Sequence, residues 1–203
     1  MTTLGKIREL GLVKTTLCAA EIAQSRVLQA VYGFDHWHAS QGFHCRCYKQ
    51  MVVDLADQLR PTTAVEIGCG LGDILCRIQA ERRYGLDLDE GVVMAARRRH
   101  RDKSQFVVGS FADVAQTREP VIDVVVMVNV LHSLDAGQVR DGVEQLRRAV
   151  EVKHLIVDEI VERENKSLHC HKFAEILGDG WSRIERVSDG SSRWLETYRA
   201  EPA

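Results

Sequence analysis

A glycine-rich turn directly after a short apolar segment constrains this chain more than any other feature. Residues 64–67 (Ala-Val-Glu-Ile) are predicted to form a buried strand, and glycines follow at positions 68, 70 and 72. Glycine tolerates positive φ and has no β-carbon to hold a ligand away from the backbone. Because ligands of open α/β sheets bind beyond the carboxyl ends of the strands, the turn is the predicted ligand site.

Apolar segments and helical patterns alternate along the chain after residue 60. Such alternation predicts a doubly wound parallel sheet. Two further strands near the C-terminus are joined by too few residues for a parallel crossover, so they should pair antiparallel. The predicted strands are 64–67, 84–86, 105–108, 121–130, 154–157, 182–187 and 193–198, and the predicted helices are 72–80, 90–100, 138–150 and 169–177.

The first 60 residues lie outside this alternation. Helices are predicted at 19–31 and 48–59, around a polar and aromatic loop at 34–47. We therefore expect an α/β protein with a Rossmann-like, doubly wound, seven-stranded sheet whose last strand is antiparallel. Residues 1–60 are expected to form an N-terminal helical cap or lid, and residues 61–203 the domain that binds the ligand.

The composition argues against several classes of function. The 203 residues have a formal net charge of -2, so no global basic field is available to hold nucleic acid or an anionic membrane. The basic run at 97–101 is predicted to be a solvated helix end, where positive charge meets the helix dipole. No apolar stretch approaches the ~20 residues that span a bilayer, and the N-terminus lacks a signal-peptide pattern. We expect a cytoplasmic protein.

The six cysteines do not amount to a disulfide scaffold. Cys69 and Cys76 lie in the α/β segment, where buried reduced thiols are common, and a reducing compartment is expected. Cys45, Cys47 and the histidines of the same loop raise zinc binding as an alternative. Their C-x-C spacing is tighter than the common zinc pair and no second pair follows, so no metal is assigned.

Two carboxylates accompany the glycine-rich turn. Glu66 lies two positions before the first glycine, and Asp87 ends the predicted second strand. A carboxylate at that strand end can accept both hydroxyls of a ribose. The glycine spacing G-x-G-x-G does not complete the nicotinamide fingerprint G-x-G-x-x-G, which disfavours a nicotinamide-dependent oxidoreductase.

The stretches E-I-G-C-G-L-G-D and G-L-D-L-D resemble the first two motifs of class I S-adenosylmethionine-dependent methyltransferases. The resemblance covers about residues 60–200, and it implies S-adenosyl-L-methionine as the cofactor. It also assigns residues 61–203 as the methyltransferase domain.

The resemblance implies a role for each cofactor-binding position. The glycines would cradle the methionine part, Glu66 would support the loop and the amino group, and Asp87 would hold the ribose. Gly-Ser-Phe stands where relatives often carry Gly-Asp, so its contact with the adenine amine should be weaker. The implied cofactor-binding residues are Glu66, Gly68, Gly70, Gly72, Asp87, Leu88, Ser110, Phe111 and Asn129.

A methyltransferase that acts on a hydroxyl must also remove a proton, and a histidine near neutral pKa is the natural base. His132 follows Asn129 on the loop after the fourth strand, close to the expected methyl group. His171 lies after the fifth strand and is the second candidate. The alternatives are that His132 packs against the cofactor and that His171 is a surface residue at a helix start.

The loop before the sheet supplies the predicted substrate-binding residues, His36, Trp37, His38 and Tyr48. Residues 34–38 and 48–49 resemble, more faintly, small methyltransferases that act on sugars or glycan precursors. The loop is expected to close over the donor and to contact the acceptor.

The chain is therefore predicted to transfer a methyl group from S-adenosylmethionine to a small-molecule acceptor, at a hydroxyl and in the sugar class. Neither nucleic acid nor a membrane is an expected partner. A non-catalytic S-adenosylmethionine-binding sensor or scaffold is the alternative, because it would need the same turn and Asp87 but no base.

Overall fold

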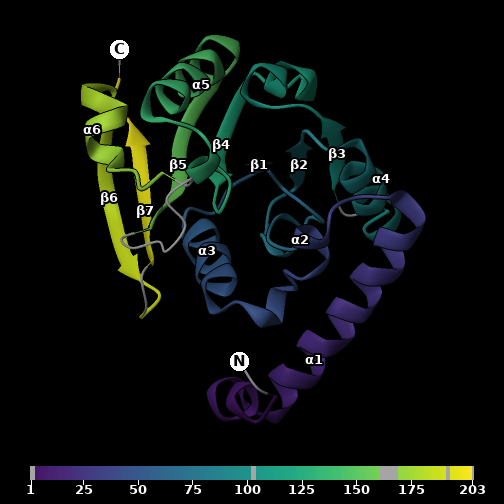
Figure 1. Cartoon of the computed structure of the whole chain (residues 1–203). Helices are drawn as coiled ribbons and strands as arrows, with labels where there is room; N and C mark the ends of the chain where they lie inside the picture. Colours follow the sequence, from purple (N-terminus) through teal and green to yellow (C-terminus); the bar gives the residue numbers. More distant parts are fainter. Residues whose placement is uncertain (1–2, 102–103, 161–168, 191–192, 203) are drawn as a thin grey trace.

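Seven strands form one sheet in the computed structural model of the chain (Figure 1). The structure describes residues 3–101, 104–160, 169–190 and 193–202. The strands are β1 (Thr63–Ile67), β2 (Arg82–Asp87), β3 (Gln105–Val108), β4 (Val121–Met127), β5 (Glu151–Ile160), β6 (Trp181–Ser188) and β7 (Arg193–Ala200).

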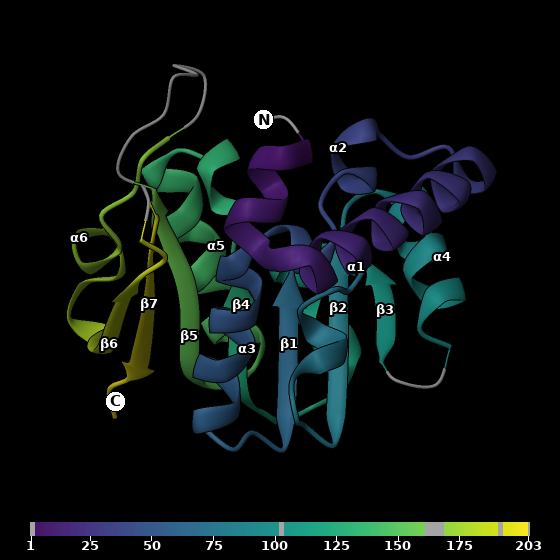
Figure 2. The same cartoon turned by 90° about the horizontal axis from the view of Figure 1, so that it is seen from below.

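The strand order is β3-β2-β1-β4-β5-β7-β6. Strand β1 pairs parallel with β2 on one side and with β4 on the other, so the order reverses at β1. Strand β7 pairs antiparallel with both β5 and β6. In Figure 2 the arrow of β7 points opposite to those of β1 and β2. The predicted doubly wound sheet with an antiparallel last strand is confirmed.

Helices cover both faces of the sheet (Figure 1). Aspartates begin three of them. Asp35 accepts from the N–H of His38, and Asp89 accepts from the N–H of Val92. Asp135 forms a capping box with Gln138. The α-helices are α1 (Thr3–Tyr32), α2 (His36–Ala39), α3 (Cys47–Gln58), α4 (Glu90–Arg99), α5 (Ala136–Ala149) and α6 (Phe173–Leu177). The 3₁₀ helices are η1 (Phe43–Cys45), η2 (Leu75–Arg77), η3 (Phe111–Thr117), η4 (Leu131–Ser133) and η5 (Gly178–Gly180).

Each face of the sheet has its own hydrophobic core, because the parallel strands are apolar on both faces. One core joins the strands to η3, α5 and α6, through residues such as Phe111, Leu146 and Phe173. The other joins them to α3, α4 and the segment after β1, through residues such as Val52 and Leu75.

The predicted helix at 72–80 does not form. Only η2, a single 3₁₀ turn, follows the glycine-rich turn, and Ile78 already has an extended backbone. The N–H of Leu75 donates to the Glu66 carboxylate at 3.0 Å, so a side chain takes the place of a helical carbonyl acceptor. The apolar spacing in residues 72–80 comes from burial and not from a helix, since Ile74, Leu75 and Ile78 are all buried.

The N-terminal helices cross the edge of the sheet where β1 and β2 end (Figure 2). Helix α1 kinks at Gly11, whose φ is 76°, and it contacts α2, α4 and η1. Helix α3 also contacts β5 and β7, so this part of the predicted cap contributes to the helical layer on one face. Within the described ranges, no helix is long and apolar enough to cross a membrane.

The basic run at the end of α4 is not simply solvated, which corrects the prediction for residues 97–101. The Nε of Arg97 donates to the backbone oxygen of Phe106 at 2.9 Å. The side chain of Arg99 is only 7% exposed and forms an ion pair with Asp73 at 3.0 Å. These arginines therefore bind α4 to β3 and to the turn after β1.

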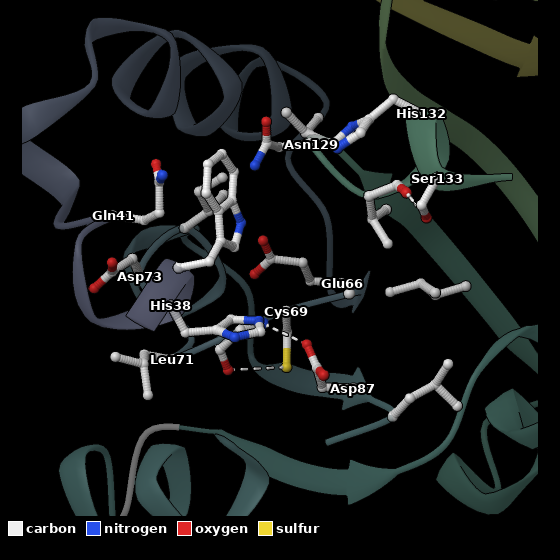
Figure 3. A pocket seen from close by; sticks show the side chains of 18 of the residues that line it. His38, Gln41, Glu66, Cys69, Leu71, Asp73, Asp87, Asn129, His132 and Ser133 are labelled. Atoms are coloured by element: carbon white, nitrogen blue, oxygen red, sulfur yellow. Dashed lines mark hydrogen bonds between the residues drawn. The ribbon is translucent and has the colours of Figure 1, made fainter. Parts of the chain in front are cut away.

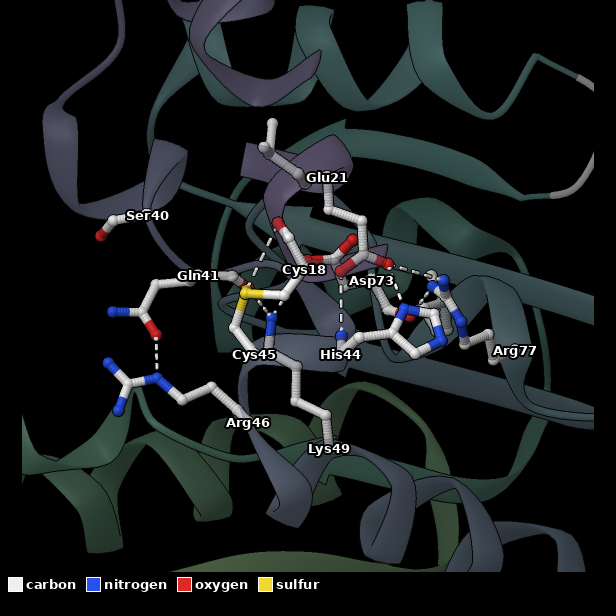
Figure 4. Close-up of polar contacts among 12 residues, drawn as sticks. Cys18, Glu21, Ser40, Gln41, His44, Cys45, Arg46, Lys49, Asp73 and Arg77 are labelled. Carbon is white, nitrogen blue, oxygen red and sulfur yellow. Dashed lines mark hydrogen bonds and ion pairs between the residues drawn. A yellow bond between two sulfur atoms is a disulfide. The ribbon is translucent and has the colours of Figure 1, made fainter. Parts of the chain in front are cut away.

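One disulfide joins α1 to η1, between Cys18 and Cys45, which are 27 residues apart in sequence. The sequence pattern predicts reduced thiols and gives no signal for this pair. Cys69 and Cys76 are free, as expected, and so is the exposed Cys47. The disulfide ties the loop before the sheet to the long N-terminal helix (Figure 4).

Replacement of Cys45 by serine should lower the melting temperature of the oxidised protein. Closing a loop of 27 residues lowers the conformational entropy of the unfolded chain. In the chain-entropy model this stabilises the folded state by about 3 to 4 kcal/mol. Thermal unfolding with and without a reductant measures the effect, which should vanish when both proteins are reduced. Cys47→Ser is the matched control and should melt like the wild type; an equal loss in both variants would contradict the assignment.

Candidate functional site

A cavity of about 460 Å³ lies where the carboxyl ends of β1, β2 and β4 meet. This is the edge where the strand order reverses, and the volume falls in the usual range for small-molecule sites. Its wall combines the glycine-rich turn, the ends of the strands and the N-terminal helices (Figure 3). Of the predicted cofactor-binding residues, it includes Glu66, Gly68, Gly70, Asp87, Leu88, Ser110, Phe111 and Asn129.

The three glycines of the turn all have positive φ, but they serve different contacts. A β-carbon on Gly68 would lie 2.5 Å from Val130. A β-carbon on Gly70 would lie 3.3 Å from the His38 ring, which covers the turn from α2. Gly72 does not line the cavity, and a β-carbon there would lie 2.6 Å from the Phe106 ring. Gly72 therefore serves packing inside the fold.

Glu66 is a buried carboxylate in the cavity wall, 3% exposed. Burial raises the pKa of Glu66 to about 8, and the Leu75 N–H and the charge of Lys49 only partly oppose this. A cation against this side chain would favour its charged form. The residue thus fits the amino group of an amino-acid ligand.

Asp87 is 8% exposed at the end of β2. It accepts from the N–H of Gly70 at 2.9 Å and from the N–H of Asp89 at 3.1 Å. Each carboxylate oxygen keeps a second acceptor position, which suits a pair of ribose hydroxyls. Next to it, Leu88 is 75% exposed, so an aromatic ligand could cover it.

Asn129, after β4, has a left-handed backbone with φ of 64°. Its N–H donates to Asp158 at 2.8 Å, and its side-chain oxygen accepts from Arg193 at 3.0 Å. Arg193 also pairs with Asp158 and lies 4.1 Å above the ring of Tyr48. Asp158 and Arg193 are not among the site residues predicted from the sequence, whose only signal for them is a charged residue near the end of β5 and another at the start of β7.

His132 lines the cavity from η4, together with Ser133 and Leu134 (Figure 3). The structure does not bring His171 to the cavity. Its ring is 5% exposed, packs against Phe173, and has Nε2 2.9 Å from the backbone oxygen of Leu131. This position indicates a structural role for His171.

Three of the four predicted substrate-binding residues line the cavity: Trp37, His38 and Tyr48. His38 is oriented by Asp35, with Nδ1 3.1 Å from the carboxylate oxygen. Tyr48 is buried, whereas Trp37 is 50% exposed at the rim. His36 is exposed and does not line the cavity.

Lys49 also lines the cavity, and sequence analysis did not include it among the site residues. Its side chain is 9% exposed and pairs with Asp73 at 3.0 Å (Figure 4). Burial alone would raise the pKa of Asp73, but Lys49 and Arg99 outweigh it and hold the pKa below its usual range. The sequence signal that could have identified Lys49 is its place directly after Tyr48, a predicted substrate-binding residue.

These residues fit the donor that the sequence motifs imply. The cavity offers a buried acceptor for an amino group and a strand-end carboxylate for ribose, and the Gly70 turn lets a ligand approach the backbone. No cluster of three or more potential metal ligands occurs among the described residues.

Residues 65–152 match a family model described as a methyltransferase domain. This match covers fewer than half of the 203 residues, and it supports the resemblance to class I S-adenosylmethionine-dependent methyltransferases. It agrees with the S-adenosylmethionine cofactor that the glycine-rich turn predicts.

Solved structures share the fold of this chain at low identity. The magnesium protoporphyrin IX methyltransferase ChlM from Synechocystis PCC 6803, with bound S-adenosylhomocysteine, has a TM-score of 0.64 and 15% identity, over 88% of this chain and 100% of that one. The N-methyltransferase NodS from Bradyrhizobium japonicum WM9, in complex with S-adenosylhomocysteine, has a TM-score of 0.67 and 17% identity, over 88% and 99%. The mitomycin 7-O-methyltransferase MmcR has a TM-score of 0.63 and 17% identity, over 94% of this chain and 69% of that one. A search of curated proteins finds no match.

Replacement of Glu66 by glutamine should stabilise the ligand-free protein at alkaline pH. A carboxyl whose pKa rises from 4.5 to about 8 on folding contributes stability that is fully present below pH 4.5 and is lost as the pH passes 8. The melting temperature of Glu66→Gln should therefore exceed that of the wild type by more at pH 9 than at pH 6. The same variant should bind S-adenosylhomocysteine more weakly in calorimetry.

The exposed Glu81 provides the control. Glu81→Gln should change neither the pH dependence of the melting temperature of the protein nor its affinity for S-adenosylhomocysteine. If Glu66→Gln raises the melting temperature by the same amount at pH 6 and pH 9, the raised pKa of the buried Glu66 carboxyl is refuted.

Proposed function

We propose that this chain is a class I S-adenosylmethionine-dependent methyltransferase that acts on a hydroxyl oxygen of a small molecule, with His132 as the general base. The observation that supports this proposal is the place of His132 in the cavity wall, on η4 immediately after β4. Histidine is the side chain whose ordinary pKa suits proton transfer near neutral pH. The net charge of -2 favours a free small molecule over nucleic acid or a membrane surface.

The proposed cofactor site follows the order of groups along the cavity. Glu66 accepts from the amino group, Asp87 accepts from the ribose hydroxyls, and the exposed face of Leu88 covers the adenine. Ser110 and Phe111 complete the adenine end, and Asn129 faces the methyl donor.

When bound, the cofactor supplies an activated methyl group for an in-line displacement. His132 accepts the proton of the acceptor hydroxyl as the new carbon–oxygen bond forms. The network of Asn129, Asp158 and Arg193 holds the loop after β4 in position, so that this histidine stays beside the reacting atoms.

The N-terminal segment, residues 1–60, acts as the lid of the site in this proposal. Trp37, His38 and Tyr48 contact the acceptor and exclude water. Residues 34–38 carry the fainter resemblance to sugar methyltransferases, which points to a sugar as the acceptor. The names of the structural neighbours include both O- and N-methyltransferases, so the choice of oxygen depends on His132.

Incubation with methyl-labelled S-adenosylmethionine and a panel of sugars, phenols and amines tests the acceptor. Mass spectrometry should find the label on a hydroxyl compound. His132→Gln should then lower kcat by roughly 10²- to 10⁴-fold and remove the fall in kcat on the acidic side of neutrality, while the affinity for S-adenosylhomocysteine stays within about twofold.

His36→Gln serves as the matched control, because this exposed histidine lies outside the cavity and its loss should leave kcat unchanged. Labelling of amines alone, or full activity of His132→Gln on a hydroxyl acceptor, would rule out the proposed chemistry.

A further inference from the structure

The missing helix after β1 changes how the site can bind an anion. In a strand–turn–helix unit, the first N–H groups of the helix and its dipole favour a negative ligand. Here η2 has only three residues, and the N–H of Leu75 is already bonded to Glu66. The amino-acid end of S-adenosylmethionine carries a carboxylate, which needs another source of positive charge.

Lys49 is positioned to supply that charge. It projects from α3 into the cavity wall, and its ammonium contacts Asp73 and the backbone oxygen of Gln41. An ammonium has three N–H donors, so these two contacts within the described residues leave one for a ligand.

The charge balance around Lys49 also favours an anion. Asp73 has ion pairs with both Lys49 and Arg99, each at 3.0 Å, and all three side chains are less than 10% exposed. Two cations thus share one carboxylate, which leaves a buried net positive charge that is costly without a further partner. Nearby Arg77 does not add to this excess, because it pairs with Glu21 at 3.3 Å.

Glu66 and Lys49 line the same cavity and interact electrostatically. Together they present an acceptor and a donor to a group that carries both charges. An α-amino acid end is such a group, with an ammonium for the carboxylate of Glu66 and a carboxylate for the ammonium of Lys49.

We propose that Lys49 of the N-terminal segment binds the α-carboxylate of S-adenosylmethionine, in place of the helix N-terminus that this chain lacks after β1. The proposal depends on the identity of the cofactor and not on the methyl acceptor. It makes α3 part of the cofactor site, so binding of the cofactor helps to hold the N-terminal segment closed.

Calorimetry with three ligands tests the proposal: S-adenosylhomocysteine, its decarboxylated analogue that keeps the amine, and 5′-methylthioadenosine, which lacks the amino-acid end. Wild-type protein should bind S-adenosylhomocysteine more tightly than the decarboxylated analogue. Lys49→Met should lower the affinity for S-adenosylhomocysteine by about 10- to 100-fold and leave the other two affinities unchanged.

Arg46→Met is the matched control, because Arg46 is an exposed cation three residues away and outside the cavity. An equal loss of all three ligands in Lys49→Met would show a structural role and overturn the proposal. If Lys49→Met does not fold, the wild-type protein still tests the proposal. Equal affinity of the wild type for S-adenosylhomocysteine and for its decarboxylated analogue would overturn the proposal. Failure of the wild type to bind any of the three would instead refute the cofactor assignment.

Discussion

The hydrogen bond from the Leu75 N–H to the carboxylate of Glu66 is the contact on which the site depends. It ends regular structure after β1, so the chain returns to β2 through one 3₁₀ turn with Ile74, Leu75 and Ile78 buried beneath it. It also holds a carboxylate inside the cavity, where burial keeps the pKa high until a cation arrives. One contact thus shapes both the turn and its preference for an amino-acid ligand.

The N-terminal segment is joined to the sheet by the apolar packing of α3 and also by charged side chains. Glu21 of α1 accepts from His44 and Arg77, while Lys49 of α3 meets Asp73 after β1 (Figure 4). Buried ion pairs of this kind add little net stability but fix geometry, since breaking one leaves an uncompensated charge. The segment is therefore held in register over the glycine-rich turn.

The strands and the site glycines could be predicted because their signals are local: apolar runs, glycine spacing and carboxylates at strand ends. The segment at 72–80 was mispredicted because its apolar spacing fits burial in an irregular segment as well as a helix, and only Glu66 decides between them. Lys49, Arg99 and Arg193 were missed for another reason. Each acts through a partner more than 20 residues away, and such pairings follow from the packing of elements and not from local pattern.

A crystal structure of the complex with S-adenosylhomocysteine tests the central claim most directly. The account predicts that the ligand lies in the cavity at the ends of β1, β2 and β4, with its amino group on Glu66 and its ribose on Asp87. Residues 72–80 should still contain no α-helix. A ligand bound elsewhere, or a regular helix over those residues with Glu66 turned away from Leu75, would contradict it.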